Sequence, residues 1–143
     1  MTTNKTFFRF EGSEFDTQTA SETPYALDIL NSKEQPTGVI IKVIGSESQP
    51  VREFQDKYLK KSQAAKFKEQ KTGKPEILGV DQIENIEIES AMVRTVGWSG
   101  VSLDGETEAV FNAENARLLF SKYRALREQV IRASEDLGNF TKT

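Results

Sequence analysis

The sequence contains no cysteine and no histidine among its 143 residues. Without cysteine, the chain has no disulfide, no thiolate metal site and no thiol nucleophile. Without histidine, it lacks the side chain that most often acts as a general base near neutral pH and most often binds a metal ion. A Ser-His-Asp triad and a Cys/His zinc site are therefore excluded. An enzyme with this composition would have to rely on carboxylates, lysines or backbone amides. We expect no catalytic residues, no metal site and no cofactor.

Long apolar runs and excess positive charge are also missing. No stretch approaches the roughly 18 apolar residues of a membrane-spanning helix, and the opening MTTNKTFFRF lacks the apolar centre of a signal peptide. The net charge is −3, whereas wholesale binding of nucleic acid needs a basic footprint. We therefore expect a cytoplasmic protein that is not associated with a membrane, and we do not expect nucleic acid as its partner.

The length is sufficient for one domain with a hydrophobic core that is stable without disulfides. Residues 1–23 are polar and lack sustained periodicity, so we predict a flexible N-terminal arm there. A short strand at Phe8 and Phe10 is left open. Residues 24–140 are predicted to form a single helix-rich α+β domain, in which an N-terminal β-hairpin packs on a bundle of three to four helices.

The hairpin is predicted over residues 24–45. Turn residues in NSKEQPTG separate two short runs in which every second residue is apolar. These positions are Tyr25, Leu27 and Ile29 in the first run, and Val39, Ile41 and Val43 in the second. Because a lone hairpin is marginal in water, it must pack on helices, add a strand from the arm or pair with another chain.

Three later segments have helical patterns: residues 50–70, 80–97 and 112–138. Ser46 or Ser48 is predicted to cap the first of them, with a proline in its first turn. Asn112 is predicted to cap the third segment, and Gly138 to end it.

The first helical segment is strongly basic. Residues 50–74 carry eight lysines or arginines against three acids, whereas residues 76–91 carry five acids and no base. We interpret this contrast as two adjacent helices of complementary charge. The alternative is a basic helix that binds nucleic acid or an acidic partner, although stacking aromatic residues are sparse there.

Two further motifs resemble ligand sites but lack the required neighbours. Lys71-Thr72-Gly73-Lys74 would need a glycine where Lys68 lies and a serine or threonine where Pro75 lies to form a phosphate-binding loop, so we interpret it as a plain turn. A cluster of four acids lacks the spacing of a calcium loop and is interpreted as a solvated helix face. These acids are Asp81, Glu84, Glu87 and Glu89.

Trp98 is the only tryptophan, and a glycine lies on either side of it in Gly97-Trp98-Ser99-Gly100. We interpret it as a buried structural anchor between two helices. A tryptophan that stacks on a ligand is the alternative.

The C-terminal helical region carries an apolar seam with alternating spacings of four and three residues, as expected for one face of a helix. The seam consists of Leu119, Tyr123, Leu126, Val130, Ala133 and Leu137. We predict that its N-terminal part packs in the core, with Leu119, Tyr123 and Leu126 as structural anchors. The C-terminal part is predicted to bind a partner or a second copy, through Val130, Ile131, Leu137 and Phe140.

A longer series of motifs gives the chain a family resemblance. It begins with a Gly-Trp-x-Gly motif and continues through a Phe-x-x-Glu-Asn-Ala-Arg stretch, an aromatic residue and Leu-Arg-Glu-Gln-Val to a final Asn-Phe. The motifs are Gly97–Gly100, Phe111–Arg117, Tyr123, Leu126–Val130 and Asn139-Phe140. Together with the hairpin and the Lys/Arg-rich helix, they resemble the tail assembly chaperones of tailed bacteriophages over residues 25–140. That family often has Pro-Trp where this chain has Arg124-Ala125, so whether residues 112–137 form one helix or two is left open.

The resemblance implies a non-enzymatic role in the cytoplasm of an infected bacterial host. Such chaperones bind the tape-measure protein, keep its apolar helices soluble and help to recruit tail-tube protein. Two alternatives are kept: a stable structural subunit of the virion tail or head-tail connector, and a regulatory nucleic-acid-binding module that uses residues 50–74. Self-association and retention in the virion are left open.

Overall fold

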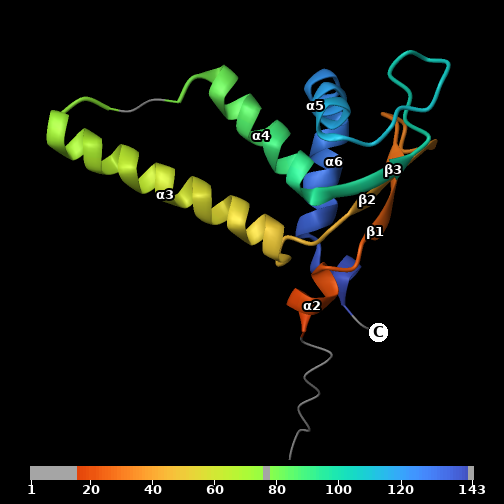
Figure 1. Ribbon diagram of the computed structural model, residues 1–143, viewed down its shortest axis with the longest axis horizontal. Helices are drawn as coiled ribbons and strands as arrows, with labels where there is room; N and C mark the ends of the chain where they lie inside the picture. The colour runs from red at the N-terminus through yellow and green to blue at the C-terminus, as the bar shows by residue number, and fades with distance from the viewer. Residues whose placement is uncertain (1–15, 76–77, 142–143) are drawn as a thin grey trace, which may run out of the picture.

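The computed structural model describes residues 16–75 and 78–141. In chain order the elements are α2 (Thr17–Ser21), β1 (Tyr25–Leu30), β2 (Pro36–Val43), α3 (Gln49–Thr72), α4 (Val80–Arg94), β3 (Thr95–Ser99), α5 (Ala113–Lys122), α6 (Arg124–Glu135) and the 3-10 helix η1 (Leu137–Phe140). Helices α4, α5 and α6 pack on one another, α6 packs against β1 and β2, and α4 packs against β3 (Figure 1). The predicted helix-rich α+β class, with an N-terminal hairpin before the helices, is confirmed.

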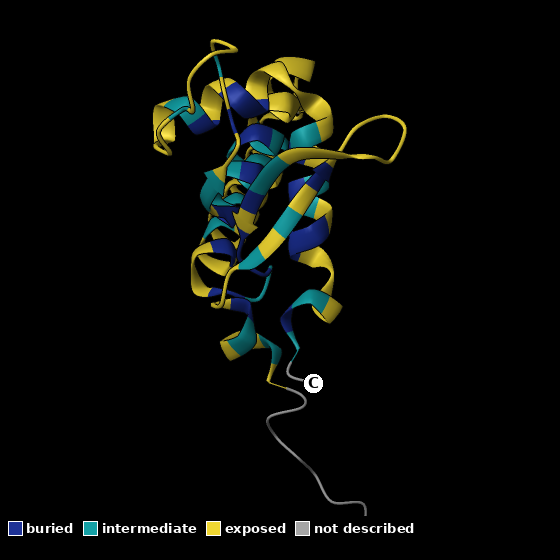
Figure 2. Cartoon of the chain, turned by 90° about the vertical axis from the view of Figure 1, so that its right-hand side faces the viewer, coloured by how far each residue is buried: buried dark blue, intermediate teal, exposed yellow. Residues whose placement is uncertain are grey.

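The sheet is antiparallel in the order β1-β2-β3. The hairpin pairs Tyr25 with Val43 and Leu27 with Ile41, so the alternation in the sequence places the predicted apolar residues on one face. That face meets the helices, and buried residues lie along the inner sides of the helices and strands (Figure 2). The buried core consists of Ile29, Ile41, Val43, Ile88, Ala91, Val101, Ala116, Leu119, Phe120, Val130 and Phe140.

The third strand is a difference from the sequence prediction. The helix predicted over residues 80–97 ends at Arg94, and Thr95–Ser99 pairs with β2 as an edge strand of the sheet. Thr95 has extended backbone angles, and its hydroxyl donates a 2.8 Å hydrogen bond to the Ala91 carbonyl. A β-branched pair followed by glycine favours this exit from the helix. The hairpin therefore gains its third strand from within the domain.

The last residues of the predicted flexible arm are also ordered against the domain, contrary to the prediction. Residues 16–23 include a short helix that packs on the domain, with Ser21 fully buried. The Gly45 amide donates a 2.8 Å hydrogen bond to the Ser21 carbonyl. The rest of the arm, residues 1–15 with the phenylalanines proposed as a strand, lies outside the described residues.

The C-terminal region forms two helices, which settles the question that its sequence leaves open. Tyr123 has φ −122° and ψ 95°, so it ends α5 and precedes α6. The predicted cap at Asn112 is confirmed, because its side chain accepts a 2.7 Å hydrogen bond from the Asn115 amide. The predicted end at Gly138 is wrong, since α6 ends at Glu135 and Gly138 lies in η1.

Candidate functional site

The feature that stands out is an uncharged groove at the far end of the hairpin. It has a volume of about 520 Å³, and none of its lining residues is aspartate, glutamate, lysine or arginine, although these make up 29% of the chain. We call it the hairpin groove. The lining residues used below are Leu30, Val39, Leu119, Tyr123, Leu126 and Gln129.

Gln129 ties one wall of the hairpin groove to the other. Its side-chain oxygen accepts a 2.9 Å hydrogen bond from the Leu30 amide, and its side-chain nitrogen donates one of 2.9 Å to the Leu30 carbonyl. Helix α6 is thereby fixed to the end of β1. Both backbone groups at this point of the outer strand are satisfied, so this position of the sheet edge is closed to a further strand.

The predicted anchors line this groove. Leu119 is buried and Leu126 is partly buried, and both contribute to the core and to the groove. Tyr123 was predicted to be a core residue, but its side chain is 43% exposed. The correction follows from its extended backbone, which takes it out of the helical face that Leu119 and Leu126 would share in one continuous helix.

Two of the four predicted partner-binding residues are buried in the domain, and the other two are more accessible. Val130 is fully buried, and Phe140 is 2% exposed with its ring edge-on to Tyr25 at 6.1 Å. The prediction that these two residues contact a partner is therefore wrong, because α6 and η1 use them to pack on the domain. Ile131 is partly buried and Leu137 is 41% exposed, so only these two remain accessible.

Trp98 has structural partners, but its location differs from the prediction. It lies on β3 and is partly buried against the core, not between two helices. Its indole nitrogen donates a 2.9 Å hydrogen bond to the Ala109 carbonyl. Its ring meets Phe111 edge-on at 5.0 Å between centroids. Trp98 therefore holds the loop that follows β3.

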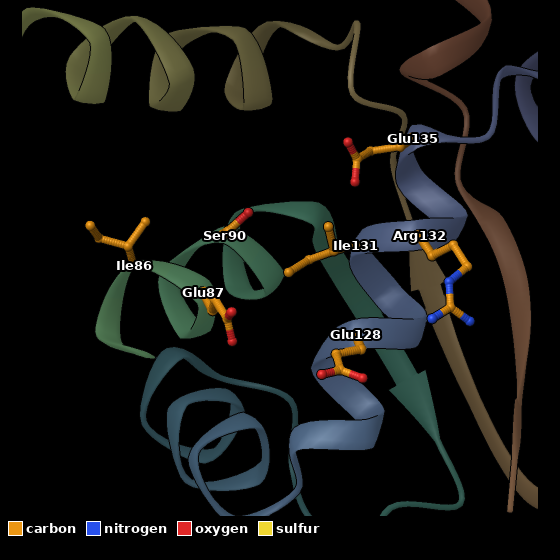
Figure 3. Close-up of a pocket in the computed structure, with 7 residues that line it drawn as sticks. All are labelled: Ile86, Glu87, Ser90, Glu128, Ile131, Arg132 and Glu135. Atoms are coloured by element: carbon orange, nitrogen blue, oxygen red, sulfur yellow. The ribbon is translucent and has the colours of Figure 1, made fainter. Parts of the chain in front are cut away.

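A second groove, of about 590 Å³, lies between α4 and α6. Figure 3 shows Ile86 and Ser90 on α4 and Ile131 on α6 around it. Unlike the hairpin groove, it has a charged lining, which includes Arg132 and three glutamates (Glu87, Glu128 and Glu135).

The acids of α4 face arginines from the C-terminal helices. Arg127, with only 4% of its side chain exposed, lies 3.4 Å from Glu84 and 3.2 Å from Glu87. It also donates a 2.9 Å hydrogen bond to the Phe120 carbonyl. Arg117 lies 3.6 Å from Glu89. The sequence contrast between residues 50–74 and 76–91 did not predict these pairs, because the arginines lie far along the chain.

Helix α3 meets α4 through Tyr58, whose hydroxyl donates a 2.7 Å hydrogen bond to Glu89. This bond raises the pKa of Tyr58 to about 12 and lowers the pKa of Glu89. The raised phenol pKa means that this contribution to stability is present below the usual tyrosine pKa and is lost as pH rises through about 12. The lowered carboxyl pKa means that Glu89 contributes above the usual glutamate pKa and loses this contribution as pH falls.

An ultraviolet titration of the phenols should detect this contact. One of the three tyrosines is expected to ionise late, near pH 12, because its proton is held by Glu89. Tyr58→Phe should remove that late step and leave the remaining titration unchanged. A late step that persists in Tyr58→Phe would show that another phenol is responsible.

Comparisons with protein-family models, curated proteins and solved structures found no match. Over the described residues, no helix is both long and apolar enough to cross a membrane.

Proposed function

We propose that this protein is a non-enzymatic tail assembly chaperone of a tailed bacteriophage, which holds an apolar helical segment of the tape-measure protein in the hairpin groove. The observation that carries the proposal is the uncharged lining of this groove in a chain with 29% charged residues. The motif resemblance over residues 25–140 supplies the partner. Tail-tube protein is the second proposed partner, and the cytoplasm of the infected host is the proposed location.

The physical basis is the shielding of apolar surface. A tape-measure helix exposes an apolar stripe until the tail tube covers it, and each Å² of apolar surface removed from water contributes about 25 cal/mol. In the hairpin groove, Leu30 is 38% exposed and Tyr123 is 43% exposed. Both side chains can therefore lose further contact with water when an amphipathic helix lies in the groove.

The rim of the groove favours a helix over an extended strand. The polar side chains there are uncharged, so they can meet a partner without leaving a buried charge unpaired. Because the Gln129 amide already pairs with both backbone groups of Leu30, strand addition at this point would have to displace it.

Coexpression with the tape-measure protein of the same phage tests the proposal. The wild-type protein should keep the tape-measure protein soluble and copurify with it. Tyr123→Glu and Leu30→Glu would each place a carboxylate against an apolar helix, and each should lower the recovered complex about tenfold or more. Leu118→Glu is the matched control, because Leu118 is 53% exposed on α5 and lies outside the groove lining.

All three variants should retain the circular dichroism of the wild type. Equal copurification by Tyr123→Glu, Leu30→Glu and Leu118→Glu would refute the groove as the binding site. Recovery of the protein from mature particles in stoichiometric amounts would favour the structural subunit of the tail or connector.

A further inference from the structure

Helix α3 is an exposed basic element that the hairpin groove does not use. Its 24 residues span about 36 Å, and Val51, in its first turn, is its only buried residue. In Figure 1 the helix projects away from the sheet, with its far end well removed from the body of the domain.

The inner side of α3 is marked by its partly buried residues. Phe54, Tyr58, Ala65 and Glu69 are intermediate in exposure, and their spacings of four, seven and four residues place them on one face. Tyr58 on this face reaches Glu89 of α4. This face is therefore the one turned toward the rest of the domain.

Two exposed large apolar residues lie outside this inner face. Leu59 is 57% exposed and Phe67 is 67% exposed. They are eight residues apart with Gln63 midway, so the three lie along one stripe of the helix surface. We call Leu59, Gln63 and Phe67 the outer stripe.

Exposed lysines border the outer stripe. Lys60, Lys66 and Lys71 lie beside it by helical spacing and are all exposed. Lys60 also pairs with Asp56 at 2.9 Å. Residues 50–74 have a net charge of +5, whereas the whole chain has −3, which leaves −8 on the remainder. Positive charge is thus concentrated on the projecting helix, where it complements an acidic partner.

We propose that the outer stripe docks an acidic amphipathic helix of a partner protein. Apolar side chains of that helix cover Leu59 and Phe67, and its carboxylates face the bordering lysines. Two large apolar side chains on the stripe favour a protein helix over nucleic acid, and the charge of −8 on the remainder opposes a long polyanion. The surface is separate from the hairpin groove, so the two proposals can fail independently.

Fluorescence anisotropy on the full-length protein tests this docking surface. The probe is a labelled peptide of about three heptads, with leucine at the a and d positions and glutamate at the flanking positions. Phe67→Ala and Leu59→Ala should each weaken its binding about fivefold or more. Lys60→Glu with Lys71→Glu should weaken it about tenfold or more and flatten its salt dependence.

Control variants test whether the loss of binding is specific to α3 or follows from changing any exposed apolar or basic residue. Val110→Ala and Lys122→Glu change an exposed apolar and an exposed basic residue outside α3, and should leave the affinity within about twofold. A peptide with lysine in place of glutamate should not bind. Unchanged binding by Phe67→Ala, or tighter binding of duplex DNA or anionic vesicles than of the acidic peptide, would overturn the proposal. So would a self-associated form that Phe67→Ala dissociates, because the occupant would then be a second copy.

Discussion

Val130→Asp is expected to leave the protein unfolded at room temperature. Val130 lies on α6 with no exposed surface, in the cluster that joins the helices to the sheet. An unpaired carboxylate in such a site costs several kcal/mol, and the whole free energy of unfolding of a domain is only about 5–15 kcal/mol. Near-ultraviolet circular dichroism and thermal melting would detect the loss of packing.

Ile131→Asp provides the matched control on the same helix. Ile131 is partly buried and lines the groove between α4 and α6, so its carboxylate could reach water. We expect a folded protein that is destabilised by about 1–2 kcal/mol. If the two variants melted at the same temperature, α6 would not present Val130 to the core as described.

Gly100→Ala is the second substitution with a large expected effect. Gly100 has φ +76°, and an added Cβ would lie 2.4 Å from the carbonyl oxygen of Gly38. The clash is with backbone, so no side-chain rotation relieves it. Left-handed strain and overpacking each cost about 1–3 kcal/mol. We expect a combined loss of about 2–6 kcal/mol, measured by denaturant unfolding.

Gly105→Ala separates the two contributions. Gly105 also has a positive φ, of +84°, but an added Cβ would meet nothing within 4 Å. Only backbone strain is expected there, about 1–3 kcal/mol. An equal loss at positions 100 and 105 would contradict the close approach of Gly38 and Gly100.

The parts of the fold that can be predicted from the sequence are those set by local signals. Alternating apolar residues on either side of a turn-rich stretch specify the hairpin. The predicted serine position marks the start of α3 at Ser48, two residues before a proline, although the Ser48 side chain does not cap the helix. The Asn112 side chain does cap α5. In each case the residues that determine the element are neighbours in sequence.

Two of the wrong predictions have a common physical cause. A helical spacing rule assumes that the phase of the helix continues, and one residue in an extended conformation resets it. Tyr123 interrupts the seam in this way, so the residues after it face different surroundings from those that a single helix predicts. Thr95 similarly turns the end of a helical pattern into a strand.

The hairpin groove could not be predicted by reading along the chain. Leu30, Val39 and Leu126 come from three different elements, and the groove exists only where those elements meet. The Gln129 contact with Leu30 joins residues 99 apart. Neither a glutamine nor a leucine at these positions predicts the contact from the sequence. The outer stripe of α3, by contrast, follows from the spacing along one helix.

Photocrosslinking from the hairpin groove tests the central proposal most directly. A photoreactive phenylalanine analogue would replace Tyr123 in cells that also make the tape-measure protein, with Leu118 as the control position. We predict a crosslink from position 123 to an apolar helical segment of the tape-measure protein, and little from position 118. Crosslinking of that protein from position 118 but not from position 123 would contradict the proposed binding site.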